Sequence, residues 1–137
     1  MSHMEDPAFI VAQHALSWRA GWILVLAGFV SGAAVGLRFH DEGFWGGYGS
    51  FRRRLVRLGH VACVALGMLN LLFALSPWPQ PGTPAAGFAA WALLAGGVGM
   101  PLVCFLTGWR RAFRHLFALP VVALVAGVLA IVIGASQ

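Results

Sequence analysis

One face of a single predicted helix carries residue types that are suited to chemistry. His60, Cys63, Gly67 and Asn70 follow one another at spacings of three, four and three residues, which places them on the same side of a helix. The surrounding residues are apolar, and polar side chains in a membrane helix are costly unless they face protein. We therefore expect this face to point inward, and one interpretation is that His60 and Asn70 hydrogen-bond to neighbouring helices.

A second interpretation pairs His60 with His115. Each histidine closely follows an arginine near the same predicted end of its helix, so the two imidazoles are expected at similar depth. Two facing imidazoles in a helical bundle can ligate the iron of a b-type haem axially. Only this general geometry resembles that of the cytochrome b bundles of respiratory complexes. The arginines that could contact the haem propionates, or anionic lipid headgroups in place of a haem, are Arg53, Arg54, Arg57, Arg111 and Arg114.

Other chemical sites are weakly indicated or absent from the sequence. Cys63 and Cys104 could join the two histidines as a Cys₂His₂ set, but zinc sites of that kind usually contain close cysteine pairs, which this sequence lacks. We therefore expect two buried thiols and no metal site. No nucleophilic triad and no phosphate-binding glycine loop with its lysine can be assembled, so no catalytic residues are assigned.

The composition indicates that these residues lie on membrane-spanning helices. Of the 137 residues, 60% are apolar and 9% are charged, against about 25% charged in an average soluble domain. This balance excludes both an ordinary soluble domain and a disordered chain. A helix crosses the hydrocarbon core with about 20 apolar residues. Four stretches are long enough, at about 18–38, 55–75, 85–108 and 115–135.

These stretches predict an all-α fold. Inside a bilayer the backbone must satisfy its own hydrogen bonds, so the four segments are expected to be helices. The short connections between the second and third and between the third and fourth segments favour antiparallel neighbours. We expect residues 1–137 to form a single integral membrane domain, an up-down bundle of four helices.

The arginines predict the orientation of the bundle. Eight of the nine arginines lie in the first and third connections, and Arg19 alone lies on the opposite side. The positive-inside rule then places the arginine-rich side in the cytoplasm of a bacterial inner membrane, with both termini on the periplasmic or exterior side. Arginines at a membrane surface favour anionic lipids as partners, and nucleic acid is not expected.

Small residues predict close helix packing in the first span. Gly28, Gly32 and Gly36 follow one another at four-residue spacing, a pattern that lets two helix backbones approach closely. The partner backbone can belong to the same bundle or to another subunit, and the space can also admit a flat cofactor.

Three functions are compatible with these patterns. The first is a non-catalytic accessory or structural subunit of a larger membrane complex, respiratory or photosynthetic, in contact with other membrane subunits. The second is a b-type haem-binding subunit for electron transfer that uses His60 and His115. The third is a homo-oligomeric pore or carrier.

Overall fold

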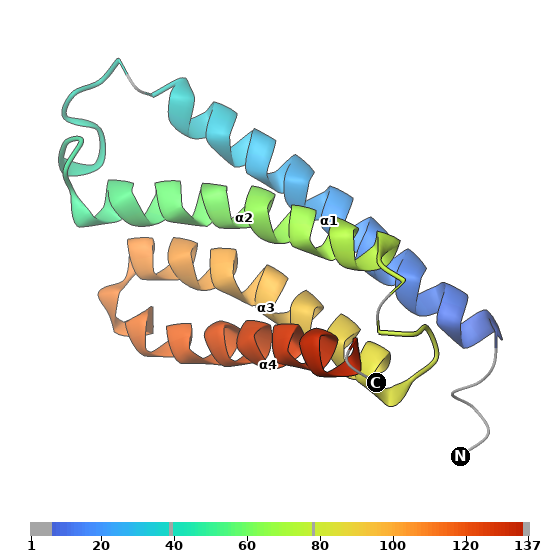
Figure 1. Ribbon diagram of the computed structural model, residues 1–137. Coiled ribbons are helices and arrows are strands. Elements are labelled where there is room, and N and C mark those ends of the chain that lie inside the picture. Colours follow the sequence, from blue (N-terminus) through green and yellow to red (C-terminus); the bar gives the residue numbers. More distant parts are fainter. Residues whose placement is uncertain (1–6, 39, 78, 136–137) are drawn as a thin grey trace.

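The computed structural model describes residues 7–38, 40–77 and 79–135, and within these ranges the chain is helical with no strand. The expected all-α class is confirmed. The four long helices are α1 (Pro7–Gly36), α2 (Phe51–Leu75), α3 (Pro84–Trp109) and α4 (Ala118–Gly134) (Figure 1). Two short 3₁₀ helices complete the fold: η1 (Phe44–Gly46) precedes α2, and η2 (Arg111–Phe117) leads into α4.

Four helical segments are long and apolar enough to cross a membrane. They cover His14–Gly36, Phe51–Leu75, Pro84–Trp109 and Arg111–Gly134. The first helix begins at Pro7, well before the expected start near residue 18, and continues through the predicted span without a break. The fourth segment starts as a 3₁₀ turn, and regular α-helix begins only at Ala118.

Local sequence explains where two of the helices begin. The Ser50 hydroxyl accepts a hydrogen bond from the backbone N–H of Arg53 at 3.2 Å, and the Thr83 hydroxyl accepts one from Ala86 at 3.3 Å. Both residues therefore act as N-caps, which satisfy backbone donors that have no partner inside the helix. Pro84 occupies the first helical position, where its missing N–H has no cost.

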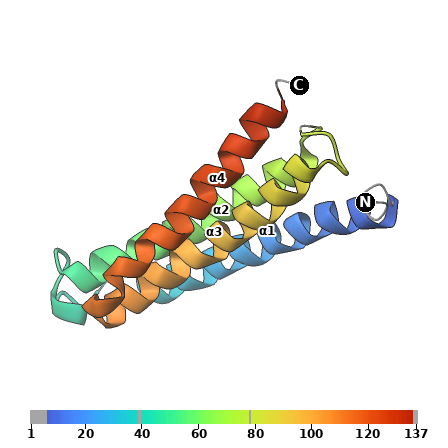
Figure 2. The same cartoon turned by 90° about the horizontal axis from the view of Figure 1, so that it is seen from below.

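The helices pack in a series that follows the chain. Successive helices run in opposite directions, and α1, α2, α3 and α4 lie side by side in that order (Figure 1). The end of α4 and the start of α1 lie on opposite sides of the molecule (Figure 2). Close approaches join α1 to α2, α2 to α3 and α3 to α4, with a smaller contact between α1 and α3. Among the described residues the backbone of α4 approaches neither α1 nor α2. The bundle is therefore not closed into the square arrangement in which α2 and α4 would face each other across a centre.

Among the described residues, α3 carries more buried side chains than any other helix. Ala89, Leu93 and Cys104 of this helix are fully buried, whereas the buried residues of α4 are Pro120 and Gly127. A cluster formed by Phe73 of α2 with Ala89, Ala90 and Leu93 of α3 is the centre of the core. The third helix thus supplies the surface on which α2 and α4 pack.

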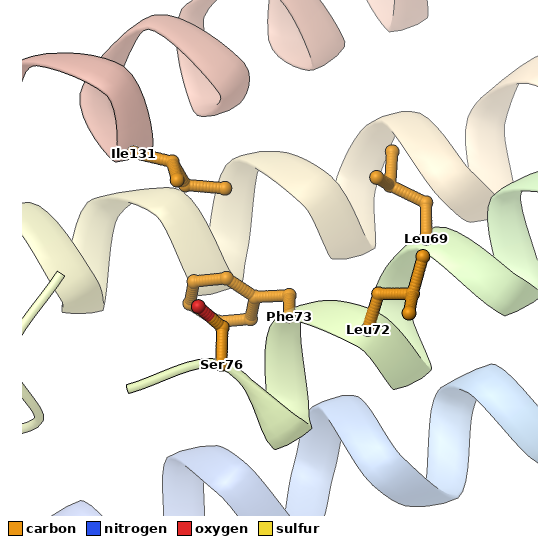
Figure 3. A pocket seen from close by; sticks show the side chains of 5 residues that line it. All are labelled: Leu69, Leu72, Phe73, Ser76 and Ile131. Carbon is orange, nitrogen blue, oxygen red and sulfur yellow. The ribbon is translucent and has the colours of Figure 1, made fainter. Parts of the chain in front are cut away.

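A small apolar pocket lies at the end of the molecule where α2 ends. It has a volume of about 190 Å³ and lies between α2 and Ile131 of α4 (Figure 3). Phe73 and Ser76 stand on one side of it and Ile131 on the other, so α2 and α4 approach each other here through side chains across α3.

Glycines bring α1 and α2 into backbone contact. A Cβ atom built on Gly67 would lie 2.8 Å from the carbonyl oxygen of Gly21 and 3.0 Å from the backbone nitrogen of Val25. A Cβ on Gly28 would overlap the side chain of Val64. Gly36, expected to share this contact, would meet no such atom within 4 Å, because α1 diverges from α2 toward this end (Figure 1).

The crossing of α1 and α2 leads to a first prediction. Replacing Gly67 with alanine should lower the free energy of unfolding by about 1–3 kcal/mol, because the new methyl group meets backbone atoms that cannot rotate away. Gly36→Ala is the matched control and should leave stability unchanged or slightly raised. Unfolding in mixed micelles, followed by circular dichroism, measures both. Equal stability of Gly67→Ala and wild type would show that the helices are not in this contact.

Candidate anion-binding site at the arginine-rich end

Eight of the nine arginines gather at the end of the molecule where α1 leads into α2 and α3 into α4 (Figure 1). The two carboxylates in these connections are Asp41 and Glu42, so the positive charge at this end is largely uncompensated. The arginines divide into two groups with different surroundings.

The first group is held by aromatic residues of the connection between α1 and α2. The guanidinium of Arg53 lies 5.9 Å from the ring centre of Phe44 and 5.6 Å from that of Tyr48, and its side chain is 2% exposed. Arg57 lies 4.4 Å from the Tyr48 ring and donates a hydrogen bond to the Tyr48 carbonyl at 3.4 Å. Cation–π contacts of this kind hold the connection against α2. Arg53 is thus enclosed by its own chain, whereas Arg57 is half-buried and bonds to the same connection.

The second group lines a surface pocket between the start of α2 and η2. The pocket has a volume of about 420 Å³. Three arginines, a threonine and three apolar residues form its wall: Arg54, Arg111, Arg114, Thr107, Phe51, Leu55 and Phe117. Arg111 is placed by a cation–π contact, with its guanidinium 4.9 Å from the Phe51 ring centre. Arg54, Arg111 and Arg114 were all expected to contact anions, and the fold brings these three to one pocket.

Thr107 is the polar residue of this pocket that the sequence analysis did not indicate. Its side chain is 1% exposed, and its hydroxyl oxygen has no hydrogen-bond partner. Thr107, Arg111 and Arg114 have a spacing that would place them on one face of a continuous helix. However, Arg110 is extended, with φ −132° and ψ 119°, and it ends α3 between them. The shared pocket therefore arises from the turn at Arg110 and not from helical periodicity.

His60 lies against α1. Its Nδ1 is 2.7 Å from the carbonyl oxygen of Gly28. Because a carbonyl can only accept a hydrogen bond, Nδ1 must carry the proton and donate it. A Cβ on Gly32 would lie 2.5 Å from Cε1 of the ring, so the absence of a side chain at Gly32 makes room for the imidazole.

The fold does not bring His60 and His115 together as a ligand pair. His60 faces α1, whereas His115 is exposed on η2, where its Nε2 accepts a hydrogen bond from Nε of Arg114 at 3.3 Å. The expected convergence of the second and fourth helices on a common centre does not occur, because α4 packs on α3. The bond from Nδ1 to Gly28 leaves Nε2 of His60 without a bond among the described residues, but a shared haem iron would require His115 to leave Arg114 and α4 to move toward α2.

The remaining polar residues of the predicted face are enclosed between helices. Asn70 is fully buried, and its Nδ2 donates to the carbonyl oxygens of Leu66 at 2.9 Å and Leu93 at 3.4 Å. It therefore joins α2 to the backbone of α3. Cys63 and Cys104 are buried free thiols. In the part of the chain that the structure describes, no three histidine, cysteine or acidic side chains gather as metal ligands would.

Comparison of the chain with protein families, with curated proteins and with solved structures gives no match. The argument for function therefore rests on the site itself.

The bond between His60 and Gly28 leads to a second prediction. Replacing His60 with alanine should lower the free energy of unfolding by about 1–2 kcal/mol, since the hydrogen bond and the ring packing are both lost. His60→Asn keeps a donor near the position of Nδ1 and should lose less. Nitrogen-15 NMR of the imidazole should find the proton on Nδ1. A proton on Nε2, together with a fully stable alanine variant, would contradict this arrangement.

Proposed function

We propose that this protein is a small non-catalytic subunit of a larger complex in a bacterial inner membrane. Its arginine-rich end faces the cytoplasm and binds anionic lipid, and other membrane subunits pack on its open helices. The observation that carries this proposal is the concentration of eight arginines at one end of four membrane-length helices. Arginine next to a transmembrane helix favours the cytoplasmic side, and each basic residue near an anionic surface contributes about 1 kcal/mol of attraction.

The open arrangement of the helices supports contact with other subunits. One face of α4 presents four side chains at helical spacing, each more than half exposed: Val122, Val125, Leu129 and Val132. This face is not used within the described part of the chain, because α4 packs on α3 through Gly127 and Pro120 on its other side. Apolar helices with one intramolecular neighbour are well suited to packing between subunits of a membrane complex.

The proposed orientation gives a third prediction. A periplasm-active reporter, such as alkaline phosphatase, fused after Gln137 should be active, and a cytoplasm-active reporter at the same position should be silent. The control is a fusion within the connection between α1 and α2, where the two reporters should give the reverse result. Cytoplasmic activity at Gln137 would overturn the orientation and the assignment of the arginine-rich end to the cytoplasm.

The proposed subunit contact gives a fourth prediction. A photo-crosslinking amino acid at Leu129 should form a stoichiometric product with one other membrane protein in native membranes. The matched control is Ile23, which is 65% exposed on α1, outside the α4 stripe. The same probe there should give no such product.

Two outcomes of the crosslinking would favour the other functions. Crosslinking of Leu129 to a second copy of the chain alone would favour the homo-oligomeric pore or carrier. A Soret band in the purified protein that is lost in both His60→Ala and His115→Ala would favour the haem-binding subunit, whatever Leu129 contacts.

A further inference from the structure

The pocket lined by Arg54, Arg111 and Arg114 has the charge of an anion site. None of the three guanidinium groups forms an ion pair among the described residues. Three like charges around one pocket repel one another, and an anion placed between them removes this repulsion. Guanidinium groups bind phosphate oxygens through two parallel N–H bonds, which are shorter and stronger than bonds between neutral groups.

Thr107 is a second and independent indication of a ligand. Its hydroxyl lines the same pocket, is nine-tenths or more buried, and has no partner in the chain. Buried hydroxyl groups in native proteins are nearly always hydrogen-bonded, so this group is expected to bond to something that occupies the pocket. A hydroxyl can rotate to donate a hydrogen bond to an anionic oxygen while the arginines hold the charge.

The rest of the wall indicates an amphiphile in place of a free ion. Phe51, Leu55 and Phe117 provide an apolar side to the pocket, which lies where the membrane-length helices end. A volume of about 420 Å³ is larger than a bare phosphate needs and falls in the range of small-molecule sites. A phospholipid headgroup places a phosphate beside glycerol and acyl carbons, which matches this division of the wall.

We propose that this pocket binds the phosphate of an acidic phospholipid, with Arg54, Arg111 and Arg114 holding the charge and the Thr107 hydroxyl donating a hydrogen bond to a phosphate oxygen. This inference rests on the proposed function and assigns its lipid contact to one site. The phosphate of phosphatidylcholine is balanced by its own choline, so the three arginines favour lipids with net negative charge, such as phosphatidylglycerol.

The decisive variant is Thr107→Val, which replaces the hydroxyl with a methyl group of similar size. The full chain is purified in neutral detergent, and binding of phosphatidylglycerol and phosphatidylcholine is measured by native mass spectrometry. Wild type should retain phosphatidylglycerol in preference to phosphatidylcholine. Thr107→Val should bind phosphatidylglycerol about ten-fold more weakly. Its thermal unfolding without lipid should be unchanged or shifted upward, because the hydroxyl has no partner to lose.

Arginine variants separate a built pocket from diffuse attraction. The double variant Arg111→Gln with Arg114→Gln should lose most of the phosphatidylglycerol binding. Arg52→Gln is the matched control, since Arg52 is exposed at the same end but stacks on Trp45, with its guanidinium 4.8 Å from the ring centre. It should bind within about two-fold of wild type, allowing for the loss of one nearby charge.

The outcomes distinguish this site from the broader proposal. If wild type and Thr107→Val bind phosphatidylglycerol equally, the proposal that this pocket binds the lipid phosphate is wrong. If both proteins still prefer phosphatidylglycerol to phosphatidylcholine, the general attraction of the arginine-rich end for anionic lipid stands. Displacement of the lipid by inorganic phosphate at equal concentration overturns the lipid assignment and identifies a soluble phosphate as the ligand. If wild type shows no preference for phosphatidylglycerol, both this site and the proposed lipid contact fail.

Discussion

The contact between α1 and α2 is the interaction on which the arginine-rich end depends. Gly21 and Gly67 let the two backbones touch, and a histidine on each helix bonds to a carbonyl of the other. His14 lies 2.9 Å from the Ala74 carbonyl oxygen, and His60 lies 2.7 Å from that of Gly28. In hydrocarbon, apolar surface gives helices little reason to associate, so close packing and interhelical hydrogen bonds must hold them together. This contact fixes α2, and the first turn of α2 carries Arg52, Arg53 and Arg54.

The helices form an open series because apolar surface alone gives helices little reason to associate in hydrocarbon. In water α4 would have to bury its apolar stripe, and a closed bundle would result. In a membrane, acyl chains or the apolar face of another subunit can cover such a stripe, so α4 needs only the close fit that Gly96 and Gly127 provide against α3. As a result, the backbones of α2 and α4 do not approach each other, and His60 and His115 have separate partners.

The sequence was sufficient to predict the helical class and the four membrane-length segments, because twenty apolar residues and the backbone constraint leave few alternatives. The inward face of His60 and Asn70 also followed from their spacing. The helix to which His60 bonds could not be predicted in this way. The spacing of polar residues shows which face of a helix they share, but not which other helix packs against that face. The start of α1 at Pro7 was missed because residues 7–17 are more polar than a span, and helix formation does not require a membrane there. Thr107 was missed because the turn at Arg110 is a matter of backbone geometry that charge and hydropathy do not encode.

The arginines at this end of the protein fall into two groups with different contacts, which explains why so many arginines lie there. A cation that stacks on an aromatic ring keeps its charge but loses part of its access to external anions. Arg53 makes such a cation–π contact with Phe44, and Arg57 makes one with Tyr48. These contacts hold the connection before α2 in place. Arg54 points away from that connection because successive residues of a helix face different sides, and there it meets Arg111 and Arg114. Adjacent arginines in one helical turn are thus directed to two places: Arg53 contacts the connection before α2, and Arg54 lines the pocket that we propose binds an anion.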